Sequence, residues 1–175
     1  MRDKKNLLIV SRCLLNENAI VSERVDSKRC PPVLQKIITE GHAEIFQLPC
    51  PEMTHLGVTR WWQSYEMYDN PGYREQCRHL GEIVAEQVKI YTRKGYRIFL
   101  LSVDGSPSCG YLFTGKQQLW GGRPEGGERG GTDKVPGKGV WIEILCDIFE
   151  KEGISFYSAS GQDDQLINFL DMMKN

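Results

Sequence analysis

Apolar residues along the chain gather in short unbroken runs, separated by longer stretches of mixed character. These runs end at proline or polar residues, which is typical of strands that are buried on both faces of a sheet. The runs predicted as strands are Leu7–Val10, Glu44–Leu48, Ile98–Val103 and Ile154–Tyr157. Together they predict a sheet of about four strands.

Between these runs, apolar residues recur every three or four positions, which is the spacing of one face of an α-helix. The longest such segment runs from Pro71 to Lys94 and is followed by Gly95, a common residue at helix ends. The predicted helices cover residues 31–41, 71–94, 140–152 and 163–173. Because strands and helices alternate, we expect one α/β domain over residues 1–175, with a mostly parallel sheet of the Rossmann or flavodoxin type.

Two segments lack either pattern. The segment from Met53 to Asn70 is expected to be irregular. The segment from Gly115 to Gly139 holds nine of the eighteen glycines, so we expect a mobile loop or lid rather than a core element.

The charge of the chain excludes several classes of partner. Twenty-two basic residues nearly balance twenty-three acidic ones, whereas nucleic-acid and acidic-membrane binders normally carry a basic excess. The first apolar run is too short for a signal peptide, and no apolar stretch approaches the ~20 residues that span a bilayer. We therefore expect a cytoplasmic protein with no nucleic-acid or membrane partner. Its six cysteines are then better suited to metal binding or catalysis than to disulfides.

Three of the cysteines share a position relative to the predicted strands. Cys13, Cys50 and Cys109 each lie shortly after the carboxyl end of a different strand. Ligands of open parallel sheets bind outside these carboxyl ends, so the three thiols are expected to meet at one functional site. A buried small apolar residue remains the alternative for each of them.

The other three cysteines lie in different surroundings. Cys77 and Cys146 fall on the apolar faces of predicted helices and are expected in the core. Cys30 precedes a predicted helix, where it could be a resolving thiol, a spare ligand or an exposed bystander.

Thiolates are soft ligands that suit zinc or an iron–sulfur cluster. No local Cys-x-x-Cys or histidine pair supplies a fourth ligand, and His55 is the nearest candidate in the sequence. Three ligands leave one coordination position open, as catalytic metal sites require. Glu52 stands two residues after Cys50 and could act as a general base. The turn that contains Ser106 and Ser108 could hydrogen-bond cluster sulfides or a substrate anion.

Three motifs carry a family resemblance: Ser11-Arg-Cys-Leu-Leu-Asn16, Pro49-Cys-Pro-Glu52 and Gly105-Ser-Pro-Ser-Cys-Gly110. In order and approximate spacing they resemble the thiouracil desulfidase (TudS) family. The resemblance implies a [4Fe-4S] cluster held by Cys13, Cys50 and Cys109 with one iron left free. It also implies that Glu52 and either Ser106 or Ser108 are catalytic.

The reaction implied by the resemblance is a non-redox removal of sulfur, as sulfide, from a small thiolated compound such as a thiouracil-like heterocycle. This chain departs from the family after Glu52, where typical members are rich in proline, and in its longer glycine-rich segment. The substrate therefore need not be thiouracil. Tryptophans and Arg60 in this region would suit a flat, partly anionic heterocycle.

Two other classes of function use the same thiols. One is a non-catalytic sensor or carrier of a cluster, metal or sulfide, and the other is a zinc-dependent hydrolase. Glu52 favours an enzyme, and the lack of a histidine pair disfavours zinc. The sequence leaves the oligomeric state open.

Overall fold

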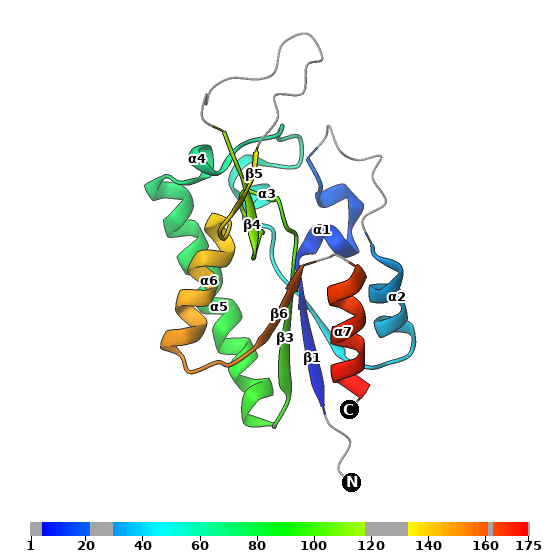
Figure 1. Cartoon of the computed structure of the whole chain (residues 1–175). Coiled ribbons are helices and arrows are strands. Elements are labelled where there is room, and N and C mark those ends of the chain that lie inside the picture. Colours follow the sequence, from blue (N-terminus) through cyan, green and yellow to red (C-terminus); the bar gives the residue numbers. More distant parts are fainter. Residues whose placement is uncertain (1–4, 22–29, 118–132, 161–162, 175) are drawn as a thin grey trace.

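The computed structural model describes residues 5–21, 30–117, 133–160 and 163–174. Its centre is a four-stranded sheet in which all neighbouring strands run parallel, in the order β2-β1-β3-β6 (Figure 1). The strands are β1 (Asn6–Val10), β2 (Glu44–Gln47), β3 (Arg97–Ser102) and β6 (Tyr157–Ser160). This order is the flavodoxin-like one, so the predicted fold class is confirmed.

Helices cover both faces of the sheet. α5 (Pro71–Arg93) and α6 (Val140–Lys151) lie on one side, and α2 (Pro32–Thr39) and α7 (Asp163–Lys174) lie on the other (Figure 1). Each helix begins and ends within a few residues of the position that the apolar spacing predicted.

The central strand β1 divides its side chains between two cores. Leu7 and Ile9 pack with α5 and α6, whereas Leu8 and Val10 pack with α2 and α7, and all four are fully buried. Alternate residues of a strand point to opposite faces, so an unbroken apolar run is what a sheet covered on both sides requires.

We expected the segment from Met53 to Asn70 to be irregular, but parts of it are helical. It contains most of α3 (Pro51–Leu56), and also α4 (Tyr65–Tyr68). α3 begins with Pro51 and has Glu52 in its first turn, both favourable at a helix start. These helices are too short to show an apolar period, which is why the pattern missed them. The four-residue α1 (Arg12–Leu15) and the 3₁₀ turn η1 (Glu17–Ala19) were missed for the same reason.

The glycine-rich segment is ordered at both ends. β4 (Phe113–Lys116) and β5 (Asp133–Pro136) pair as an antiparallel hairpin, so strands stand at both ends of the segment that we expected to be a mobile loop or lid. The prediction of a mobile lid falls mainly on residues 118–132, which lie outside the described residues. The last strand, β6, begins three residues later than the apolar run suggested.

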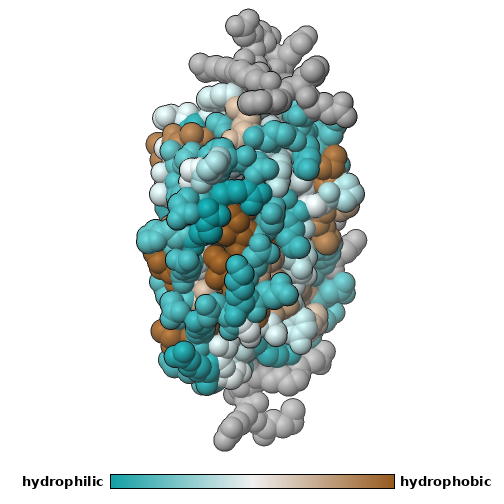
Figure 2. Space-filling view, turned by 90° about the vertical axis from the view of Figure 1, so that its left-hand side faces the viewer, coloured by the Kyte–Doolittle hydropathy of each residue, from teal (hydrophilic) through white to brown (hydrophobic). Residues whose placement is uncertain are grey.

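The side of the molecule that carries α5 is mainly hydrophilic, with apolar residues gathered in a hollow near its centre (Figure 2). In the part of the chain that the structure describes, no helix is long and apolar enough to cross a membrane. All six cysteines are free thiols.

Candidate functional site

A cavity of about 300 Å³ lies at the carboxyl ends of β1, β2 and β3. The three cysteines that follow these strands, Cys13, Cys50 and Cys109, all line it, together with Glu52 and Ser106. The sheet reverses its strand order between β1 and β3, and α/β proteins bind ligands at such a switch point. The cavity wall also includes Arg60, Trp62, Tyr68, Asp104 and Lys134.

Each thiol is positioned by a different local structure. Cys13 lies in α1 and is half-buried, Cys50 is the N-cap of α3, and Cys109 ends the turn after β3. Cys50 and Cys109 are each only 9% exposed. Burial raises the pKa of Cys109 well above its ordinary value, and Glu52 and the other two thiols act in the same direction. The three sulfurs therefore share one electrostatic environment.

The turn that presents Cys109 is held by two side-chain acceptors. Ser106 Oγ accepts hydrogen bonds from the amides of Ser108 (3.3 Å) and Cys109 (2.9 Å). Asp104 Oδ1 accepts from three further amides, at 3.0 to 3.3 Å, those of Tyr111, Leu112 and Phe113. Because Ser106 only accepts in these bonds, its own proton can be donated into the cavity.

The amino end of α6 closes the same turn from behind. The amides of Val140 and Trp141 donate to the carbonyl oxygens of Pro107 and Ser108, both at 3.1 Å. The first amides of a helix have no partner within it, so the turn satisfies them. A Cβ atom at Gly139 would lie 2.5 Å from the carbonyl carbon of Ser108, so only glycine fits this close approach.

The two serines of the turn have different surroundings. Ser106 lines the cavity, whereas Ser108 is fully buried and bonds the hydroxyl of Tyr73 at 2.7 Å. Of the two serines considered from the sequence, only Ser106 faces the space where a ligand would lie.

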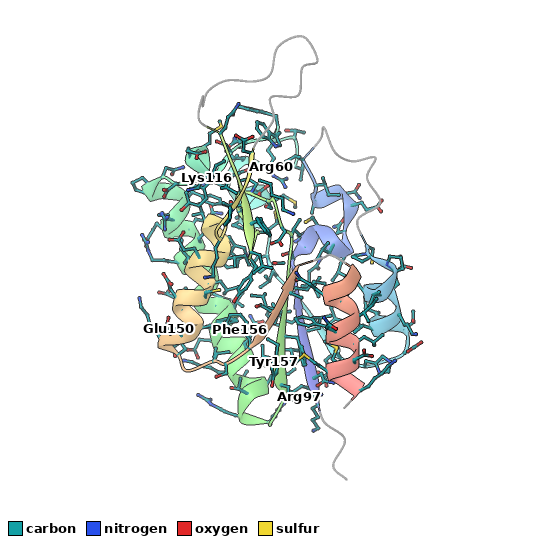
Figure 3. All side chains as sticks on the ribbon, in the orientation of Figure 1. Arg60, Arg97, Lys116, Glu150, Phe156 and Tyr157 are labelled. Carbon is teal, nitrogen blue, oxygen red and sulfur yellow. The ribbon has the colours of Figure 1, made fainter. Side chains whose placement is uncertain are left out.

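Glu52 is paired with Arg60 inside the protein. Arg60 Nε donates to Glu52 Oε2 at 3.1 Å, and its Nη2 donates to the carbonyl oxygen of Ala19 at 2.6 Å. Figure 3 places Arg60 at the end of the molecule where β1 and β3 terminate. Burial alone would lower the pKa of Arg60, but the charge and hydrogen bond of Glu52, together with Cys50 and Tyr68, outweigh it and the pKa rises. The guanidinium therefore pairs with Glu52, and Arg60 also lines the cavity.

The family model described as "Putative 2-thiouracil desulfurase" matches residues 5–119, which include all three cavity cysteines. The chain belongs to this family.

This member of the putative 2-thiouracil desulfurase family is also similar to a relative and to a solved structure. An uncharacterized protein of Methanocaldococcus jannaschii is 31% identical over 105 residues, which cover 60% of this chain and 67% of that protein. The structure of a [4Fe-4S]-dependent thiouracil desulfidase, TudS, superposes with a TM-score of 0.52 and 23% sequence identity. That match covers 96% of this chain and 99% of the other, and it shows that the two share a fold.

The remaining candidate ligands of this family member lie away from the cavity. Cys77 is fully buried in the core, as predicted, and Cys146 is half-buried on α6. Cys30 packs against the core under α2 and α7. His55 Nδ1 hydrogen-bonds Gln76 Oε1 at 3.0 Å and does not line the cavity. Among the described residues, no three His, Cys, Asp or Glu side chains form a site for a single metal ion.

Sequence reasoning missed several residues of the site. Asp104 stands two residues after the end of β3, so its place near a strand end was an available signal. Tyr68 and Tyr73 gave no such signal, because they reach the site only through the path of α4 and α5. Burial, followed by the charge of Glu52, raises the pKa of Tyr68 far above its usual range, so its hydroxyl stays protonated.

Proposed function

We propose that this protein is an iron–sulfur-dependent desulfidase that removes sulfur, as sulfide, from a small thiolated heterocycle without net oxidation or reduction. The observation that carries the proposal is the meeting of Cys13, Cys50, Cys109, Glu52 and Ser106 at one cavity. The family description and the activity named for TudS support the same reaction class.

The donor set fits a [4Fe-4S] cluster. The site offers three soft thiol ligands around one cavity. In a cluster each cysteine binds a different iron, so its ligands surround a volume. Cys13, Cys50 and Cys109 would each hold one iron of such a cluster and leave one iron without a protein ligand.

In the proposed reaction, water replaces the sulfur of a thiocarbonyl group, giving the carbonyl compound and hydrogen sulfide. The bound cluster would supply an open iron that takes the substrate sulfur and, being soft, selects it over oxygen. Glu52 accepts the proton of the attacking water, while Arg60 holds the carboxylate in one orientation. Ser106 donates a hydrogen bond from its hydroxyl group toward the substrate. Trp62 lines the cavity and offers a flat surface against which a heterocycle can pack.

We propose in addition that the protein works in the cytoplasm on a small molecule, independently of nucleic acids and membranes. The near balance of charge and the free thiols support this assignment.

Replacing the carboxylate tests the function. Anaerobically reconstituted wild-type protein should contain roughly four irons and four sulfides per chain and release sulfide from a thiolated pyrimidine. Glu52→Gln keeps the shape of the side chain but removes the base, so sulfide release should fall by roughly 10²–10⁴ while the iron content stays unchanged. Glu86→Gln makes the same chemical change on the surface of α5 and should leave the rate unchanged.

The same measurements separate the other classes of function. A loaded wild-type protein that releases sulfide from no thiolated base, nucleoside or thioamide would be a sensor or carrier. Stoichiometric zinc without iron would point to a hydrolase instead. If Glu52→Gln turns over at the wild-type rate, the assignment of Glu52 as the general base is wrong.

A further inference from the structure

The hydroxyl of Ser108 lies between Tyr73 and Cys109 in the interior of the protein. Its Oγ is 2.7 Å from the hydroxyl oxygen of Tyr73 and 3.9 Å from the sulfur of Cys109. Tyr73 and Ser108 are fully buried, and Cys109 is 9% exposed. The three groups form a continuous hydrogen-bonded chain that the proposed reaction does not use.

The direction of this chain depends on the state of Cys109. A free thiol can donate its proton to Ser108. A thiolate bound to a metal has no proton, so it can only accept. Each hydroxyl donates one proton, so if both contacts are kept, Ser108 donates to the sulfur of Cys109 and Tyr73 donates to Ser108.

Tyr73 is fixed in the position that this polarity requires. It stands in the first turn of α5, where its amide donates to Asn70 Oδ1 at 2.9 Å. Its ring packs against the rings of Tyr68 and His55, with centroids 4.7 and 5.2 Å away. The hydroxyl oxygen therefore cannot move away from Ser108 without disturbing two ring contacts.

We propose that Tyr73 and Ser108 are positioning residues that donate a hydrogen bond to the Cys109 sulfur when it binds the iron–sulfur cluster. This inference rests on the proposed function, since it needs the cluster. Hydrogen bonds to the sulfurs of a cluster help to set its reduction potential, and outer partners of ligands strengthen metal binding. The chain would therefore make the cluster easier to reduce and slower to lose iron.

Hydroxyl-deletion variants test the chain by the midpoint potential of the reconstituted cluster. Ser108→Ala should shift this potential to a more negative value. Tyr73→Phe keeps the ring and should shift it less, in the same direction, because Ser108 can still donate. The double variant should match Ser108→Ala alone, since Tyr73 acts only through Ser108. Iron loss to a chelator should be about tenfold faster in Ser108→Ala.

Ser102→Ala is the matched control. Ser102 is also fully buried, and its hydroxyl donates to the Ala159 carbonyl at 3.1 Å rather than to a cysteine. Its loss should leave the potential at the wild-type value.

Three outcomes would overturn the inference. The first is equal potentials in wild type, Ser108→Ala and Tyr73→Phe, and the second is a further shift from Tyr73→Phe in the Ser108→Ala background. The third is a wild-type protein that takes up no cluster, which would overturn the proposed function as well. None of these measurements needs sulfide release. A cluster-loaded protein without turnover would contradict the proposed function, but its midpoint potentials would still test this inference.

Discussion

The ion pair of Glu52 and Arg60 keeps a charged carboxylate beside the cavity in a place that water hardly reaches. Their side chains are 10% and 2% exposed. Removing two charges from water costs several kcal/mol per ion, by order of magnitude, unless good geometry and further hydrogen bonds offset it. Here the Ala19 carbonyl and the sulfur of Cys50, 3.8 Å from Arg60 Nη2, provide such contacts. The pair therefore fixes the direction of the carboxylate that the proposed reaction needs.

Arg60→Met should destabilise the protein strongly. It removes the cation that faces Glu52 and leaves that charge in a poorly hydrated place, which typically costs about 3–5 kcal/mol in the free energy of unfolding. Guanidinium denaturation monitored by circular dichroism measures this loss.

The control for this variant is Arg78→Met. Arg78 pairs with Glu75 on the surface, with side chains 49% and 72% exposed, and exposed pairs contribute at most about 1 kcal/mol. Adding Glu52→Gln to Arg60→Met should recover part of the loss, because the buried charge is then gone. Equal small losses in both single variants would contradict this view of the pair.

At the scale of elements, the turn after β3 and the amino end of α6 fit together as one unit. The backbone of Gly139 has φ −73° and ψ 157°, which any residue can adopt. Only space prevents a side chain there, because an added Cβ would meet the backbone of Pro107 and Ser108 at 2.5 to 2.9 Å. The glycine thus lets the helix approach the turn that carries Cys109.

Gly139→Ala should force the turn and the helix apart. We expect a loss of about 1–3 kcal/mol in stability, as for other overpacked sites, and a lower iron content after reconstitution. Gly72→Ala is the control: it lies in α5, and its added Cβ would meet its nearest neighbour at an ordinary 3.5 Å. That variant should be neutral or stabilised by up to about 1 kcal/mol. Similar thermal unfolding curves for both variants would show that the contact has no structural importance.

The elements could be predicted from the sequence, whereas the contacts between their side chains could not. Long helices and central strands follow from apolar spacing, and parallel order then brings Cys13, Cys50 and Cys109 to one edge. The hydrogen-bond partners of the site residues cannot be predicted from apolar spacing. Glu52 meets Arg60 because the chain after α3 folds back, and Ser108 meets Tyr73 across a separation of 35 residues. Such pairs depend on the path of loops, which carries no periodic signal.

At the scale of the whole molecule, two cores hold the sheet while the cavity lies at one end of it. The apolar residues of β1 and β3 divide between the cores, so each strand is anchored on both faces. The thiols stand just beyond these anchored strands, in α1, at the start of α3 and in the turn before β4. A group bound to all three thiols would link three segments that are attached to the cores only through the strands before them.

Loading the cluster should therefore stabilise the entire fold. A ligand that binds only the native state, present at 100 times its dissociation constant, adds about 2.7 kcal/mol, which corresponds to roughly 5–11 °C in Tm for a chain of this size. Scanning calorimetry of the apo and reconstituted proteins measures the gain. Amide exchange should slow most at residues 13–16, 50–54 and 106–110, where bound cysteines restrain local opening. Cys109→Ala should lose the gain in Tm, whereas Cys146→Ala, on α6 and outside the cavity wall, should keep it. If Cys109→Ala gained as much from reconstitution as the wild type, the iron would be bound elsewhere, and the three strand ends would not form its site.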